Sequence, residues 1–219
     1  MSIEIRPPYT MQIATTPDQV TALQAFIGDA YLREFRARIP HFLPLLIGLY
    51  RADDTLVAAC GLQLAATGPL YLEQYLDLPA EQQLAAMQDE APRRDSIAEI
   101  GNLATSAPGN GRLMFAAMCQ LLYQQHMEWV MFTGTRKLRN SLRRLQLNPI
   151  TLAAASPARV GDHADHWGDY YQHQPMVMAG RLAGRLAEGR NILSANSLLL
   201  PLLAPTPSLH GAADARAWQ

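Results

Sequence analysis

The chain has 219 residues, of which 49% are hydrophobic and 17% are charged, and its formal net charge at pH 7 is −1. That length is enough for one sizeable core without requiring a second domain. The near-neutral charge gives no reason to expect a nucleic acid or a strongly anionic membrane as partner. Two cysteines, Cys60 and Cys119, are too few for the disulfide framework of a secreted protein, so we expect both to be buried free thiols.

The N-terminus carries no sign of a targeting segment. Residues 1–6 read Met-Ser-Ile-Glu-Ile-Arg and lack the basic region and the apolar run of a signal peptide. No run of about 18 uninterrupted apolar residues occurs, so we expect no membrane span. These observations predict a cytoplasmic protein.

The first predicted element is a helix. Thr16 is a capping side chain and Pro17 suits the first helical position. The helix should run to the break at Pro40. One face stays apolar through Val20, Leu23, Ile27, Tyr31 and Phe35.

An antiparallel hairpin and two short segments follow. Leu45–Arg51 and Leu56–Leu64 are apolar strands joined by Ala52–Thr55. Tyr71–Tyr75 is ambiguous between strand and helix. Ala80–Asp89 follows Pro79 and is predicted to be a short helix.

The centre of the chain has the pattern of a parallel βαβ unit. Ile97–Ala104 is a short apolar segment typical of a buried strand. Ser106–Arg112 contains one Pro and two Gly and cannot continue that strand. Trp129–Thr133 is a second buried strand. Between turn and strand an apolar stripe predicts a helix through Leu113, Met114, Ala117, Met118, Leu121 and Leu122.

The remaining elements are predicted in this order. Thr135–Leu145 is a helix, Ile150–Ala155 a strand and Ser156–Asp169 a polar loop. Met176–Ala179 is a final strand, and Leu182–Glu188 a short terminal helix. Periodicity alone supports one mixed α/β domain.

We assign residues 1–190 to this domain and residues 191–219 to a Leu/Pro/Ala-rich tail. Pro201, Pro205 and Pro207 leave little room for regular structure in that tail.

The turn at Gly109, Asn110, Gly111 and Arg112 has the geometry of an anion site. It lies at the N-terminus of the predicted helix, where unpaired backbone N–H groups and the helix dipole favour negative charge. Such a site suits the phosphates of a pantetheine-bearing acyl donor, to which Arg112 could add a charge-assisted contact. The alternative is an ordinary tight turn, because an isolated Gly-x-Gly is weak evidence.

Several motifs resemble a known family. The βαβ unit resembles the acyl-donor half of the GNAT acyltransferases, although Ser106 stands where Gln or Arg is usual. More closely, four motifs resemble the bacterial thermostable hemolysins, which themselves resemble acyl-homoserine-lactone synthases. The resemblance covers roughly residues 15–190, and its motifs are Gly68–Leu76, Glu99–Ala104, Phe132–Asn140 and Trp167–Tyr171.

The resemblance implies a GNAT-like acyltransferase fold in a single α/β domain with a mixed sheet, and it implies site residues. Acyl-CoA or acyl-phosphopantetheine would be the co-substrate, and no metal is implied. Leu103 and Ala104 would join the turn in holding this donor. Asn140 would contact the pantetheine arm, although the Tyr that usually accompanies it is absent.

Glu99 is the candidate catalytic residue. A carboxylate in an apolar strand is costly to bury unless it is paired or used. The resemblance implies that it holds the acceptor amine and takes its proton. The alternative is a structural ion pair, for instance with an Arg.

Two further groups of polar residues have open alternatives. Glu73 and Tyr75 line the acceptor pocket or face solvent from a strand. Arg136, Arg139 and Arg143, with Lys137 and Arg144, form either a solvated helix face or a dock for an acidic acyl carrier protein.

Asp162, His163, Asp165 and His166 are residue types that bind metals. They lie in a polar loop without a second ligand set at a recognisable spacing, and we expect no metal there.

The sequence therefore predicts an N-acyltransferase that moves an acyl group from a pantetheine thioester to a small amine. The alternative is a membrane-active cytolysin without enzymatic activity. The missing secretion signal and membrane span argue against it, and its support is the Leu-rich stretch Ile192–Leu203.

Overall fold

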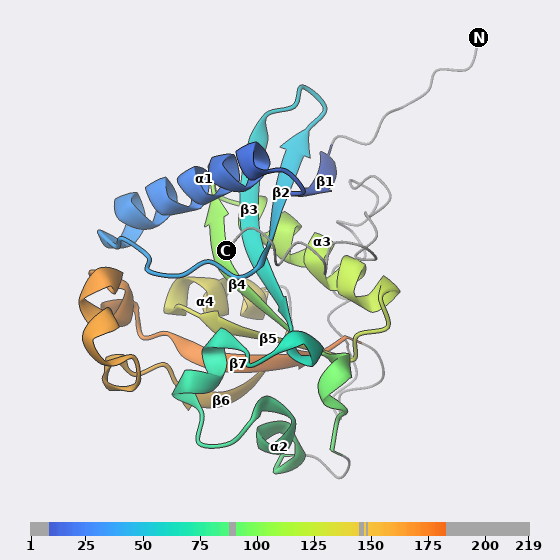
Figure 1. Cartoon of the computed structure of the whole chain (residues 1–219), viewed down its shortest axis with the longest axis vertical. Coiled ribbons are helices and arrows are strands. Elements are labelled where there is room, and N and C mark those ends of the chain that lie inside the picture. The colour runs from blue at the N-terminus through green and yellow to red at the C-terminus, as the bar shows by residue number, and fades with distance from the viewer. Residues whose placement is uncertain (1–8, 88–90, 145–146, 148, 183–219) are drawn as a thin grey trace.

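A seven-stranded mixed sheet in the order β1-β2-β3-β4-β5-β7-β6 organises the chain (Figure 1). The computed structural model describes residues 9–87, 91–144, 147 and 149–182. All neighbouring strands are antiparallel except β4 and β5, which are parallel. The strands are β1 (Tyr9–Ile13), β2 (Leu45–Arg51), β3 (Leu56–Leu64), β4 (Ile97–Thr105), β5 (Trp129–Gly134), β6 (Ile150–Ala154) and β7 (Met176–Arg181). The prediction of a single α/β domain with a mixed sheet is confirmed.

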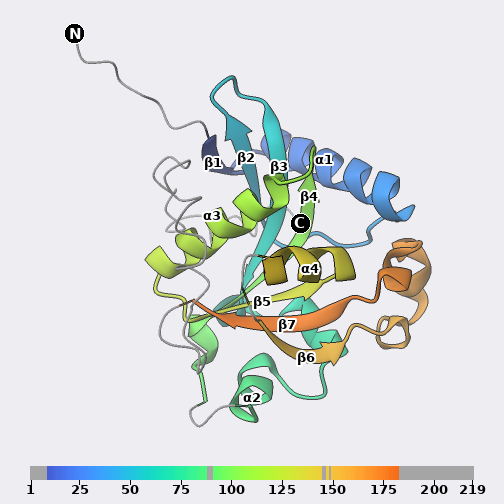
Figure 2. The ribbon, with the colours of Figure 1, turned by 180° about the vertical axis from the view of Figure 1, so that it is seen from behind.

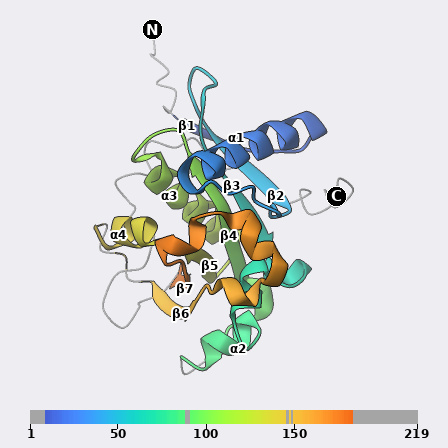
Figure 3. The same cartoon turned by 90° about the vertical axis from the view of Figure 1, so that its left-hand side faces the viewer.

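Helices cover both faces of the sheet. The helix α1 (Pro17–Phe35) crosses the face seen in Figure 1, and α3 (Asn110–Gln124) and α4 (Arg136–Arg144) lie in front in Figure 2. Figure 3 shows α1 and α3 from the side. The short helix α2 (Ala80–Ala85) lies beside β6 at the far end of the sheet from β1.

Local sequence explains where α1 begins and ends. The Thr16 side chain accepts a hydrogen bond from the Gln19 N–H, and the Gln19 side chain accepts one from the Thr16 N–H. This reciprocal cap satisfies donors that the first helical turn leaves free. Arg36 ends the helix in a left-handed conformation with φ 55°. The helix start predicted from Thr16 and Pro17 is confirmed.

The other predicted elements differ in detail. The hairpin, the central βαβ unit and the two buried free thiols are confirmed. Tyr71–Tyr75 is a 3₁₀ helix, which resolves the ambiguity between strand and helix. The prediction of a polar loop over Ser156–Asp169 is wrong, because most of it coils into two 3₁₀ segments, Pro157–Arg159 and Gly161–Trp167.

The strand β1 was not predicted at all. It pairs with β2 at the edge of the sheet, where only Met11 of its five residues is buried, so its apolar pattern is weak. Two predictions lie outside the described residues: most of the Leu182–Glu188 helix and the tail at residues 191–219. None of the helices in the described part is long and apolar enough to cross a membrane.

The central strands β4 and β5 separate part of the way along. Their parallel pairing ends at Ile100 and Phe132, although β4 continues to Thr105. Near this point the pairing of β3 with β4 shifts its register, and Asn102 takes φ 50°. Such a bulge bends the strand away from its neighbour. The sheet is therefore open between the second half of β4 and the end of β5.

Candidate active site

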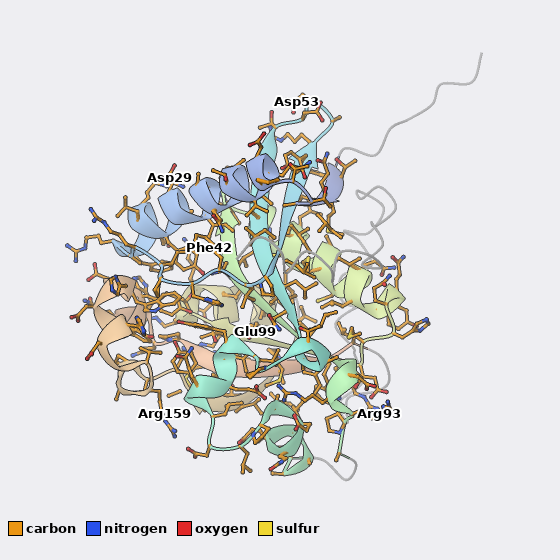
Figure 4. All side chains as sticks on the ribbon, in the orientation of Figure 1. Asp29, Phe42, Asp53, Arg93, Glu99 and Arg159 are labelled. Carbon is orange, nitrogen blue, oxygen red and sulfur yellow. The ribbon has the colours of Figure 1, made fainter. Side chains whose placement is uncertain are left out.

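Glu99 lies in the middle of the molecule, behind the 3₁₀ helix Tyr71–Tyr75 (Figure 4). Its side chain is buried, with 3% exposed, and one carboxylate oxygen accepts a hydrogen bond from the Leu72 N–H at 3.2 Å. Burial raises the pKa of Glu99 to about 8, even though the backbone N–H groups of Leu72 and Tyr71 act to lower it. Among the described residues no Arg or Lys forms an ion pair with it, so the ion-pair alternative is not what holds Glu99.

A cavity of about 60 Å³ adjoins Glu99 and passes through the opening between β4 and β5. On the α1 face its walls are aromatic. On the α3 and α4 face they are Phe115 and Leu138. The described lining residues are Tyr31, His41, Leu43, Tyr71, Tyr75, Glu99, Ile100, Gly101, Asn102, Leu103, Phe115, Phe132, Thr133, Leu138, Trp167 and Tyr170.

The aromatic wall is continuous. The ring centroid of Trp167 lies 5.1 Å from that of Tyr170 and 6.3 Å from that of Tyr71. The Tyr31 ring lies 6.2 Å from Trp167 and stacks with Tyr170 at 6.3 Å. Rings at these distances stabilise one another and leave a rigid apolar surface around the carboxyl group.

The chain between α1 and β2 covers one side of this cavity. The Asn102 side chain accepts a hydrogen bond from the Leu43 N–H at 2.8 Å and donates one to the His41 carbonyl at 3.1 Å. Leu43 sits against Gly61 and Gly101, where an added Cβ would lie 2.7 Å and 2.8 Å from its side chain. The bulge in β4 therefore holds His41 in place, where its ring stacks on Tyr71 at 4.9 Å.

The segment that carries Trp167 and Tyr170 docks on the end of α1. Gly168 has φ 50°, and a Cβ there would lie 2.4 Å from the Phe35 carbonyl oxygen. The Asp169 N–H donates to that same carbonyl at 2.7 Å, and the Asp169 carboxylate pairs with Arg36. Only a glycine allows this approach, so the position fixes the aromatic wall.

Substitution at this glycine gives a stability prediction. We expect Gly168→Ala to lower the free energy of unfolding by about 2–4 kcal/mol, because it adds a backbone clash to an unfavourable φ. The matched control is Gly161→Ala, where φ is 57° but nothing lies within 4 Å of the added Cβ, and the expected cost is about 1–2 kcal/mol. Urea denaturation of both variants measures the difference, and equal losses would contradict the docking role of Gly168.

The glycine-rich turn leads into α3 as predicted. Gly109 has φ 95°, and the Arg112 guanidinium turns back to within 4.0 Å of the position of a Gly109 Cβ. The turn is anchored on β3, because the Val57 carbonyl accepts hydrogen bonds from the Ser106 hydroxyl and the Asn110 side chain at 3.1 and 3.3 Å. Any contact of Asn110 with the acyl donor would therefore come from its backbone.

The other predicted donor residues are dispersed. Leu103 lines the cavity, and Ala104 lies next to it on the part of β4 that has no β5 partner. Asn140 is exposed on α4. It follows Leu138 by two residues, or about 200° around the helix, so it does not share the side that faces the cavity.

The two predicted acceptor residues have different roles. Tyr75 lines the cavity, and its hydroxyl shares a hydrogen bond with that of Tyr171 at 2.9 Å. Glu73 is not among the lining residues. Its carboxylate pairs with Arg94 at 2.7 Å and accepts a hydrogen bond from the Ala80 N–H at 2.7 Å. Burial alone would raise the pKa of Glu73, but these hydrogen bonds outweigh it and the pKa is lowered. Glu73 therefore joins the start of α2 to the segment that precedes β4.

The basic side chains of α4 divide into two groups. Arg136, Arg143 and Arg144 are exposed, whereas Arg139 is half-buried. Lys137 forms an ion pair with Glu34 of α1 at 2.7 Å. Within the described ranges no three His, Cys, Asp or Glu side chains gather as a metal site would require.

Sequence reasoning missed most of the cavity wall. Tyr31, His41, Tyr71, Trp167 and Tyr170 come from three segments far apart in the chain. The available signal was Trp167–Tyr171, a motif without a predicted secondary structure whose aromatic residues are too numerous for a solvated loop.

Comparison with known proteins places this fold. A family model described as thermostable hemolysin matches residues 13–185. No curated protein matches. The N-acyl amino acid synthase FeeM, from uncultured soil microbes, is 16% identical with a TM-score of 0.58, covering 80% of this chain and 91% of its own.

Two acyl-homoserine lactone synthases are also similar in structure. The CoA-dependent synthase BjaI, solved with SAM and isopentyl-CoA, is 13% identical with a TM-score of 0.60, covering 94% of this chain and 97% of its own. The synthase LasI is 12% identical with a TM-score of 0.52, covering 83% and 98%. At such identities the likeness establishes the GNAT-like fold.

Proposed function

The chain belongs to the thermostable hemolysin family, and we propose that it is an N-acyltransferase acting on a pantetheine thioester and a small amine. The observation that carries the proposal is the cavity that passes through the sheet beside Glu99. A thioester entering from the α3 and α4 face would meet an amine held on the aromatic face. The fold shared with FeeM and BjaI supports this arrangement.

The proposed reaction has one bond formed and one broken. The amine nitrogen attacks the thioester carbonyl, the new C–N bond forms, and the C–S bond breaks with release of the pantetheine thiolate. The amine loses a proton to the Glu99 carboxylate, and that proton is returned to the thiolate. Attack needs the neutral amine about 3 Å from the carbonyl carbon, and the walls of the cavity would hold it there.

The donor would be held by backbone more than by side chains. Phosphates suit the N-terminus of α3 at Gly109 and Gly111, with Arg112 beside them. The amides of the pantetheine arm suit the free edge of β4 at Leu103 and Ala104, in the manner of an added strand. Acyl-CoA is supported as donor by the CoA-dependent relatives in structure. Since acyl donors of this kind are made in the cytoplasm, the proposal includes a cytoplasmic location.

The test of this proposal is release of free thiol from acyl-CoA or acyl carrier protein in the presence of a panel of amines. The product mass should equal that of the free carboxylic acid plus the amine minus one water. The same preparation should leave dye-loaded liposomes intact. Leakage without any thiol release would favour the cytolytic alternative and contradict the proposal.

A carrier protein as donor would use the arginines of α4, of which Arg143 is exposed and Arg139 is half-buried. We expect Arg139→Glu with Arg143→Glu to lower kcat/KM for acyl carrier protein at least about tenfold more than for acyl-CoA, because acidic carrier surfaces would be repelled. The difference should shrink as salt rises, since exposed charges are screened within about 10 Å at 0.1 M.

The control for that pair is Arg33→Glu with Arg51→Glu, exposed charge reversals on α1 and the hairpin. They change the net charge equally and should leave the donor ratio unchanged. Equal losses for both donors in the α4 variant would point to a folding defect or to contacts with coenzyme A itself.

A further inference from the structure

The aromatic end of the cavity has an unused hydrogen-bond donor. The indole Nε1 of Trp167 is buried and has no hydrogen-bond partner within the described part of the chain. The indole N–H lies close to the Tyr71 hydroxyl and acts to lower the pKa of Tyr71. The two groups do not have the geometry of a hydrogen bond. An unpaired buried donor is costly, so this N–H favours an acceptor oxygen that is better placed than the Tyr71 hydroxyl.

The same end of the cavity carries the Glu99 carboxyl group. Burial is the main reason that the pKa of Tyr71 and of Tyr170 is raised, and the charge of Glu99 adds to both. Both hydroxyls therefore lie within electrostatic reach of Glu99. Glu99 and Trp167 both line the same cavity, which is walled by aromatic rings. Rings and a carboxylate together bind an ammonium group well.

The charges of the wall restrict what can enter with the amine. Among the described lining residues there is no Arg or Lys. His41 is the basic side chain present, and burial lowers its pKa, which favours the neutral ring. An ammonium beside ionised Glu99 leaves the cavity neutral. A carboxylate on the acceptor would leave a buried negative charge without a partner, which is unfavourable.

The size of the cavity sets a second restriction. The cavity holds about 60 Å³, and one water molecule needs about 10–15 Å³. A few heavy atoms fit beside Glu99. An amine nitrogen, two carbons and one oxygen are of that size.

We propose that the acceptor is a small 1,2-amino alcohol, or an amine ending in one, and not an α-amino acid. The amine lies against Glu99, and the hydroxyl oxygen accepts the Trp167 indole N–H. This inference rests on the proposed acyl transfer, whose acceptor class it names.

The experiment compares three acceptors of nearly equal size with octanoyl-CoA and octanoyl carrier protein as donors. They are 2-aminoethanol, propylamine, which replaces the hydroxyl by a methyl, and glycine, which replaces it by a carboxylate. Above pH 8, where Glu99 is ionised, we expect kcat/KM for 2-aminoethanol to exceed that for glycine at least about 100-fold, the size of the repulsion between two carboxylates about 5 Å apart near the protein surface.

Trp167→Phe tests the second contact. It should reduce the preference for 2-aminoethanol over propylamine and leave kcat/KM for propylamine within about threefold, because only the indole N–H is lost. Glycine used as well as 2-aminoethanol by the unaltered protein would overturn the proposal, even if Trp167→Phe fails to fold. A preference for 2-aminoethanol over propylamine that survives in folded Trp167→Phe would also overturn the proposal.

A failure of the proposed acyl transfer can be distinguished from a failure of the acceptor inference. If no amine releases thiol from either donor, calorimetry of 2-aminoethanol and glycine with the protein still decides the acceptor inference. Binding of 2-aminoethanol alone supports the site while the proposed reaction fails. Binding of glycine, or of neither compound, overturns the acceptor inference.

Discussion

Glu99→Gln is expected to lower turnover about 10²–10⁴-fold, the usual contribution of a general base, with donor affinity unchanged. Glutamine keeps the shape of the side chain, and its amide oxygen can still accept the Leu72 N–H that Glu99 accepts at 3.2 Å. The fold should therefore survive. The measurement is steady-state thiol release, paired with calorimetry of the donor.

The pH profile separates a base from a structural group. Because burial raises the pKa of Glu99 to about 8, kcat/KM of the unaltered protein should rise with pH, reach half its maximum near pH 8 and level off above it. In Glu99→Gln the rise should follow the acceptor amine instead, whose pKa is about 10 for a simple alkylamine. An unchanged rate and profile would mean that proton removal takes place elsewhere.

The same carboxyl group makes stability depend on pH, and its sign can be stated. The folded-state pKa of Glu99 lies above its ordinary value of 4.5, at about 8, so between these values the folded state binds more protons than the unfolded state. Stability contributed by Glu99 is present below about pH 4.5 and is lost as the pH rises toward 8. Glu99→Gln should remove this loss. Urea denaturation at pH 5.5 and 8.5 should show a smaller decrease for the variant than for the unaltered protein.

Gly111→Trp is expected to weaken acyl-donor binding at least about 100-fold, because a large side chain would cover the backbone N–H groups that phosphates approach at the start of α3. The fold should tolerate it. The nearest atom to an added Cβ is the Thr105 methyl at 3.3 Å, at the protein surface. Calorimetry with acyl-CoA measures the loss, and circular dichroism confirms the folded state.

Two further variants sharpen that test. Gly111→Ala adds only the Cβ and should reduce affinity slightly, so a graded response identifies the side chain as the obstacle. Gly28→Trp places the same ring on α1, where nothing lies within 4 Å of the added Cβ, and should leave donor affinity unchanged. Unchanged affinity of Gly111→Trp for every acyl-CoA and acyl carrier protein would remove the phosphate site.

The elements of the proposed donor half could be predicted from sequence because they are local. The strand, turn and helix from Ile97 to Gln124 are continuous, and each carries its own signal in apolar spacing or in glycine. Glu99 stood out for the same reason, since a charge in an apolar strand is visible without knowledge of the fold.

The acceptor half could not be predicted in this way. Its wall joins Tyr31, Tyr71 and Trp167, which only the tertiary fold brings together. The bulge at Asn102 also defeats simple alternation. Strict alternation would put Leu103 on the same face as Glu99, yet Leu103 packs with the core beneath α3. No residue pattern in the sequence indicates where a strand contains an inserted residue.

The docking of Gly168 and Asp169 on the end of α1 has an evolutionary consequence. Most of its contacts are made to main-chain carbonyls, which every sequence possesses, so the attachment is indifferent to the neighbouring side chains. Trp167 and Tyr170 flank this anchor, and neither belongs to the turn at the start of α3. Under the proposed function, descendants of one ancestor could change the amine that they accept while keeping the same site for the acyl donor.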